Sequence, residues 1–191
     1  MNYRRFAYIA VFGGLWGVWE IFAGFVIHAL NIPIKGVVMS SVAAMIILVG
    51  RRFVPEKGAT FSMGAVAAVL KLLSFSGFML SPFIAILIES TIAEIILTLS
   101  KNTFPGYFVA GGLVVMWTPL HRLLIQGLIF SNRIYIFYVE LLKRVSKLFG
   151  VPESKSIMLF VAYLAVLFLF GAIVGVVSWF IGKNLRKELE R

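Results

Sequence analysis

Residues 156–182 read SIMLFVAYLAVLFLFGAIVGVVSWFIG, and no charged side chain interrupts them. A helix needs about 20 mostly apolar residues to cross the hydrocarbon core of a bilayer. The stretch therefore predicts a membrane-spanning helix from Ser156 to Gly182, and it indicates the class of the whole protein.

Five more apolar runs precede this one, and turn signals at residues 31–33, 55–58 and 81–82 separate several of them. The predicted spans are 6–30, 34–49, 59–80, 83–99 and 104–130. The first run continues well past the length of a signal-peptide core, so we interpret it as a retained span. The prediction is an all-α, six-transmembrane-helix bundle in which residues 1–191 form a single integral membrane domain.

The composition is that of a membrane protein. Of the 191 residues, 61% are hydrophobic and 14% are charged, and the mean hydropathy is +0.99. Soluble domains are about 45–50% apolar and about 25% charged. A water-soluble fold of this size has too little interior to hide so much apolar surface. No polar stretch is long enough to build a separate soluble domain.

The chain lacks the residues or motifs that several chemistries need. It has no cysteine, which excludes disulfides and thiolate chemistry. It has no GxxxxGK[ST] phosphate loop, no HExxH pair and no serine elbow. We therefore expect no enzyme activity, no catalytic residue, no metal site and no cofactor. The net charge of +10 comes from basic residues at span ends and in loops, which indicates contact with membrane lipid and no nucleic-acid partner.

Residues 131–153 have a different character from the spans on either side. Ile134, Phe137, Leu141 and Leu148 recur at helical spacing, with basic residues between them. This amphipathic pattern predicts an interfacial segment between spans 5 and 6.

The basic residues of the short loops and tails predict the orientation, because Lys and Arg accumulate on the cytoplasmic side. Six spans place both termini on one side, and this side carries nearly all of these basic residues, whereas the other carries only Lys35. We expect a multi-pass protein of the plasma (inner) membrane with both termini cytoplasmic. The basic segment 131–153 falls on the outer side in this arrangement, so its side stays open.

Ionisable side chains inside spans are costly and are functional candidates by default. At a rise of about 1.5 Å per residue, most of those found here lie at mid-depth or in the outer half of their spans. Together with an aromatic wall they predict a small-molecule pocket that opens outward. The predicted substrate-binding residues are Glu20, His28, Lys71, Glu89, Trp117, His121 and Arg122.

A purely structural interpretation stays open for most of these residues. Lys71 then pairs with either glutamate of the fourth span and holds helices together. His28 and Trp117 are then interfacial residues, and Arg122 reaches the headgroups from a fifth span that ends early. Glu20 is harder to explain in this way, because it interrupts a long apolar run.

Small residues four positions apart allow close helix packing. Ala10 with Gly14, and Gly13 with Gly17, form such pairs in the first span. They pack within the chain or dock a separate membrane partner.

Three stretches carry a resemblance to a known family: residues 51–59 (RRFVPEKGA), 64–71 (GAVAAVLK) and 88–96 (IESTIAEII). This basic turn, the Ala-rich third span and the Glu-bearing fourth span resemble the substrate-binding S components of energy-coupling factor (ECF) vitamin transporters. The likeness is to the hydroxymethylpyrimidine/thiamine branch in particular. It covers residues 14–99 in pattern and the remainder in the number of spans.

The resemblance implies a high-affinity substrate-binding subunit of an ECF-type ABC importer for a vitamin or similar small nutrient. Its first span would dock on a transmembrane coupling subunit, and a pair of partner ATPases would hydrolyse the ATP. The family's docking surface carries Ala-xxx-Ala pairs; Ala10 and Gly14 match in kind, whereas Ala7 is followed by Val11. Two other functions stay open: a stand-alone oligomeric channel or facilitator, and a non-transport membrane scaffold.

Overall fold

A computed structural model describes residues 3–29, 35–74, 80–129 and 155–189, together with positions 143, 147, 150 and 152. The described part of the chain folds into helices without a strand, so the all-α prediction is confirmed for it. These helices are α1 (Tyr3–Ala29), α2 (Lys35–Phe53), α3 (Ala59–Leu72), α4 (Leu80–Leu99), α5 (Phe104–Ile129) and α7 (Ser156–Leu189).

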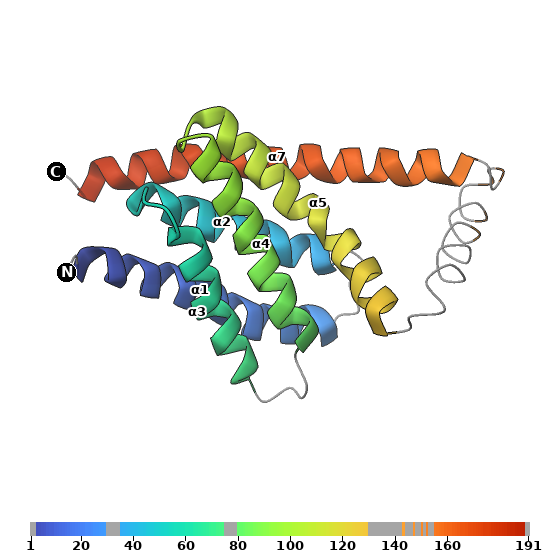
Figure 1. Ribbon diagram of the computed structural model, residues 1–191, viewed down its shortest axis with the longest axis horizontal. Helices are drawn as coiled ribbons and strands as arrows, with labels where there is room; N and C mark the ends of the chain where they lie inside the picture. The colour runs from blue at the N-terminus through green and yellow to red at the C-terminus, as the bar shows by residue number, and fades with distance from the viewer. Residues whose placement is uncertain are drawn as a thin grey trace.

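The helices pack in two layers of three (Figure 1). In one layer α2 lies between α1 and α7, and in the other α4 lies between α3 and α5. The layers are joined where α1 packs on α3 and where α5 packs on α7. Helix α2 also contacts all three helices of the other layer. Its residues Ala43, Ala44, Ile47 and Leu48 are fully buried. Both ends of the described chain lie at the same end of the bundle (Figure 1).

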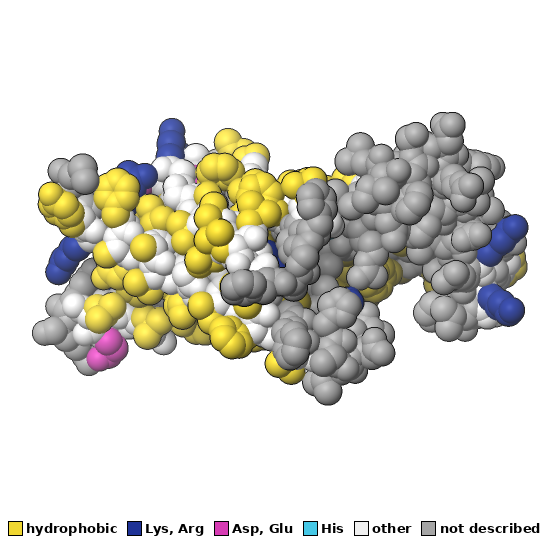
Figure 2. Space-filling view, turned by 90° about the horizontal axis from the view of Figure 1, so that it is seen from below, with side chains coloured by type: hydrophobic (Ala, Val, Ile, Leu, Met, Phe, Trp, Pro, Cys, Tyr) yellow, Lys and Arg dark blue, Asp and Glu magenta, His cyan; other side chains and the backbone are white. Residues whose placement is uncertain are grey.

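Within the described residues, four helices are long and apolar enough to cross a membrane: α1, α2, α4 and α7. Their outward surfaces are apolar, as at Phe22 of α1 and Val166 of α7, which are 69% and 62% exposed. Hydrophobic side chains also cover much of the described surface on the face that Figure 2 shows. Large contiguous apolar surfaces are rare on soluble monomers, so this chain is that of a membrane protein.

Several predicted span limits differ from the observed helices. A single span over 59–80 is wrong, because α3 ends at Leu72. Its 14 residues extend about 21 Å, less than the roughly 30 Å of a bilayer core. Ser81 and Pro82 do not break a helix. They lie in the first turn of α4, where a proline removes no intrahelical hydrogen bond.

Two helices continue into the basic residues that the sequence places in a loop or tail. Helix α2 includes Arg51 and Arg52, and α7 continues past Gly182 to Leu189. Basic side chains are favourable in a last helical turn, because they face the negative end of the helix dipole. The predicted amphipathic segment 131–153 lies outside the described residues, apart from four single positions.

Arg51 forms hydrogen bonds to both the α2–α3 turn and the α4–α5 turn. Its side chain is only 1% exposed. Its guanidinium donates to both carboxylate oxygens of Glu94 at 3.0 and 2.9 Å. It also donates to Asn102 Oδ1 at 2.8 Å and Thr98 Oγ1 at 3.0 Å. The planar guanidinium suits this spread of acceptors, because its five N–H donors form a rigid fork.

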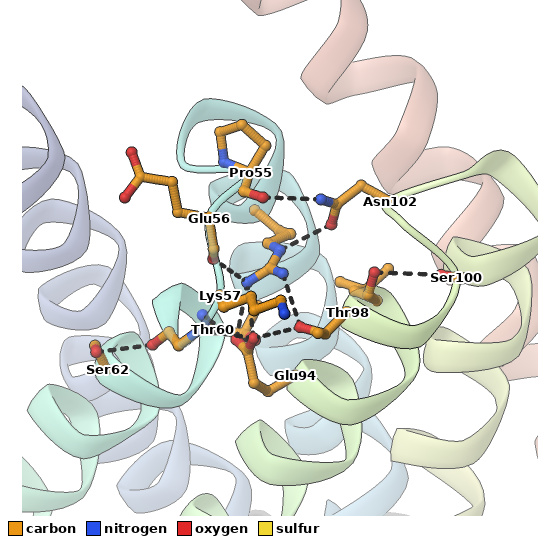
Figure 3. Close-up of polar contacts among 12 residues, drawn as sticks. Pro55, Glu56, Lys57, Thr60, Ser62, Glu94, Thr98, Ser100 and Asn102 are labelled. Carbon is orange, nitrogen blue, oxygen red and sulfur yellow. Dashed lines mark hydrogen bonds and ion pairs between the residues drawn. The ribbon is translucent and has the colours of Figure 1, made fainter.

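Glu94 accepts further hydrogen bonds from the first residues of α3 (Figure 3). The backbone N–H groups of Gly58 and Thr60 donate to its carboxylate at 2.7 and 3.0 Å. The hydroxyls of Thr60 and Thr98 donate to it as well. Glu94 is thus satisfied by protein groups at the end of the bundle that carries the termini, and this network explains it as a structural residue.

Helix α7 packs on its neighbours through glycines and one arginine. A Cβ atom added to Gly175 would lie 2.0 Å from the carbonyl oxygen of Tyr107, so the α5 and α7 backbones meet there without room for a side chain. At the same end, Arg52 Cζ of α2 lies 3.9 Å from the ring centroid of Trp179. This cation–π contact fixes α7 against α2.

Candidate functional site

A cavity of about 340 Å³ lies at the end of the bundle away from both termini. Its volume falls in the range of small-molecule sites, about 300–1,000 Å³. The ends of α1 and α5 and the beginnings of α2 and α4 surround it. Its lining residues are Glu20, Gly36, Met39, Ser40, Ser81, Pro82, Ala85, Ile86, Glu89, Thr118 and His121.

Glu20 enters the wall from α1 and is 8% exposed. The indole N–H of Trp16, one turn earlier, donates to Glu20 Oε1 at 3.4 Å. From the second layer, Lys71 Nζ lies 3.9 Å from Glu20 Oε2 and donates to the Glu20 backbone carbonyl at 2.6 Å. Lys71 sits in the last turn of α3, where the helix dipole favours a cation. Trp16 and Lys71 together therefore hold the Glu20 carboxylate in place.

Glu89 enters the wall from α4 and is 7% exposed. The hydroxyl of Ser40 on α2 lies 2.8 Å from Glu89 Oε1 and 3.3 Å from the carbonyl oxygen of Val114. A serine hydroxyl has one hydrogen, so Ser40 donates to one of these two acceptors at a time. No basic side chain of the described residues forms an ion pair with Glu89.

The third polar group of the cavity is His121 on α5. Its Nε2 lies 3.4 Å from the hydroxyl oxygen of Ser81 on α4. Thr118, one turn before His121, lines the cavity with a buried hydroxyl that has no hydrogen-bond partner among the described residues. Groups of this kind are unusual in folded proteins, where buried polar atoms are nearly always paired.

Among the described residues that the cavity and its ion pair involve, acidic groups outnumber basic ones. Glu20 and Glu89 contribute two carboxylates, whereas Lys71 contributes one ammonium. An unmatched buried charge is costly unless a partner or a proton neutralises it. Either a proton on Glu89 or a ligand that brings a cationic group or hydrogen-bond donors would remove this imbalance.

Three of the predicted site residues, Glu20, Glu89 and His121, line this cavity, and Lys71 supports Glu20. Trp117 does not line it; its ring lies 6.2 Å from that of His121, centroid to centroid. His28 and Arg122 lie in helices, but their side chains are outside the described part of the chain.

The structural interpretation of Lys71 as the partner of a fourth-span glutamate is wrong. Lys71 pairs with Glu20 of the first span, while Glu94 pairs with Arg51. The sequence reasoning also missed Ser40, Ser81 and Thr118. In the sequence, each of these residues is a hydroxyl side chain inside an apolar run. This pattern is a weak indication of a binding site, because serine and threonine also occur at ordinary helix interfaces in membranes.

The predicted docking residues of α1 face two directions. A Cβ atom on Gly13 or Gly17 would lie within 2.7 Å of atoms of α3, so these glycines serve packing within the chain. Ala10 is exposed, and Gly14 has no neighbouring atom within 4 Å of an added Cβ. The outward face of α1 thus keeps the Ala10–Gly14 pair.

No cluster of three or more metal-ligating side chains occurs within the described ranges. Comparisons with protein-family models, curated proteins and solved structures find no match.

Proposed function

We propose that this protein is the membrane-embedded, substrate-binding subunit of an importer, and that it captures a small nutrient in the cavity between Glu20 and Glu89. The observation that carries the proposal is the pair of buried carboxylates, from two different helices, facing one cavity at the bundle end opposite the termini. Buried charges at membrane depth are expensive and mark ligand or ion pathways.

The ligand class follows from the lining. A cationic nitrogen of the ligand would be held between the two carboxylates, and Thr118 and Ser40 would accept or donate hydrogen bonds beside it. Met39, Ala85 and Ile86 supply an apolar surface for the body of the molecule. A small heterocycle with a basic or amine substituent fits this arrangement.

We further propose that all six helices belong to the membrane domain, that both termini are cytoplasmic and that the cavity opens outward. Helix α3 is too short to cross the bilayer alone. Its first residues contact Glu94 on the cytoplasmic side, and Lys71 in its last turn contacts Glu20.

The coupling partner follows from the resemblance to the S components of ECF transporters. The outward Ala10–Gly14 pair of α1 would contact a transmembrane coupling subunit, and two partner ATPases would supply the energy. Small residues on a lipid-facing surface support this role, because they let a second helix approach closely.

The test is native mass spectrometry of the gently purified protein, with identification of any retained small molecule. We expect one ligand per chain. Glu20→Gln and Glu89→Gln should each weaken its binding about tenfold to 100-fold, the value of a hydrogen bond to a charged group. Glu56→Gln is the matched control, because Glu56 lies at the other end of the bundle.

Two outcomes would contradict the proposal. Equal ligand retention in all three variants, each melting like the parent protein, would remove the cavity as the binding site. Solute passage into liposomes that contain only this chain, without ATP, would favour the stand-alone channel instead.

A further inference from the structure

A second cavity, of about 360 Å³, lies at the end of the bundle that carries the termini. It is formed where the beginning of α1, the end of α2 and the end of α7 meet. Its lining residues are Arg4, Arg5, Tyr8, Phe53, Val54, Glu56, Arg186 and Leu189. It shares no lining residue with the first cavity.

The polar half of this cavity is strongly basic. Three arginines face one glutamate, and Glu56 is already ion-paired with Arg5. Arg5 also donates to the carbonyl oxygen of Lys57 at 3.3 Å, which keeps its guanidinium in the wall. Arg186 donates an N–H to the Arg52 carbonyl at 3.4 Å, which places its guanidinium in the same wall. The excess of positive charge suits an anion, and the forked donors of arginine suit a phosphate.

The other half of the cavity is apolar. The rings of Tyr8 and Phe53 pack with centroids 5.2 Å apart. Beyond the cavity on α1, Tyr3 and Phe6 are 75% and 55% exposed. An anionic head placed among the arginines would therefore have its attached chains next to apolar helix surface.

We propose that this cavity binds the phosphate headgroup of an anionic phospholipid. The location favours a lipid over a free phosphate, because the cavity lies between the ends of α1, α2 and α7, three of the helices that are apolar and long enough to cross a membrane. Basic residues at span ends are attracted to anionic lipid. The lipid would join the two ends of the described chain, from Arg4 on α1 to Arg186 on α7.

The test is a lipid titration of the full chain in detergent, followed by native mass spectrometry. We compare phosphatidylglycerol with phosphatidylcholine of the same acyl chains. The variant Arg4→Gln/Arg186→Gln removes two cavity charges. The control Lys183→Gln/Lys187→Gln removes two exposed charges from the same end of α7 that do not line the cavity.

We expect one tightly bound phosphatidylglycerol and much weaker binding of phosphatidylcholine. The arginine variant should bind phosphatidylglycerol about 30-fold more weakly, and the lysine variant should change binding less than about threefold. The single variant Arg4→Gln repeats the measurement if the double variant melts early.

Three results would overturn the assignment. The first is equal binding of both lipids. The second is an equal loss in the arginine and lysine variants, which would indicate general attraction to a basic surface. The third is binding of glycerol phosphate alone as tightly as the whole lipid, which would indicate a free phosphate ligand.

Discussion

Replacing Arg51 with methionine should lower the free energy of unfolding by about 3 kcal/mol. Breaking a buried ion pair by removing one partner costs about 3–5 kcal/mol, because the other charge is left buried. Arg51 is 1% exposed and donates to Glu94, Asn102 and Thr98. Glu94 keeps the N–H groups of Gly58 and Thr60 as donors after the change, which places the loss at the lower end of that range.

The measurement is equilibrium unfolding in mixed detergent micelles, followed by helical circular dichroism. Arg51→Lys should lose less than Arg51→Met, since it keeps the charge but not the planar fork of donors. The control Lys183→Met changes an exposed basic residue of α7 and should stay within about 0.5 kcal/mol of the parent protein.

A double-mutant cycle separates the ion pair from general packing effects. Arg51→Met combined with Glu94→Gln should give a coupling energy above about 1 kcal/mol, because the two side chains are in direct contact. The reasoning is refuted if Arg51→Met costs no more than Lys183→Met, or if the cycle returns no coupling.

Two further predictions concern the packing of α7. Gly175→Ala should lower the free energy of unfolding by about 1–3 kcal/mol, because the added Cβ meets backbone of α5. Gly14→Ala, whose Cβ meets nothing, should not lower the unfolding midpoint, because alanine is favoured over glycine inside a helix. Equal losses in the two variants would contradict the close approach. Arg52→Gln should lower the free energy of unfolding by about 1 kcal/mol, the value of a partly exposed cation–π contact, and should shift the Trp179 fluorescence. Unchanged fluorescence in a variant that keeps only Trp179 would show that the contact is absent.

The candidate site could be predicted in its residue types but not in its pairs. Glu20, Lys71, Glu89 and His121 stand out in the sequence, because each interrupts an apolar run and a buried charge is costly. That Lys71 pairs with Glu20 depends on the packing of α1 against α3. Ser40 contacts Glu89 only because α2 packs against α4 and α5 of the other layer.

Hydrophobic length determined the helical class and the approximate position of most helices from the sequence alone, since the transfer of a segment into lipid is a local sum over its own residues. The role of Arg51 was decided by the tertiary structure. Beside a turn it has the pattern of a loop charge at the cytoplasmic face, yet it is fully buried against Glu94. Its partner lies 43 residues away in the chain, and a local pattern of hydrophobicity carries no information about which distant groups a folded chain brings into contact.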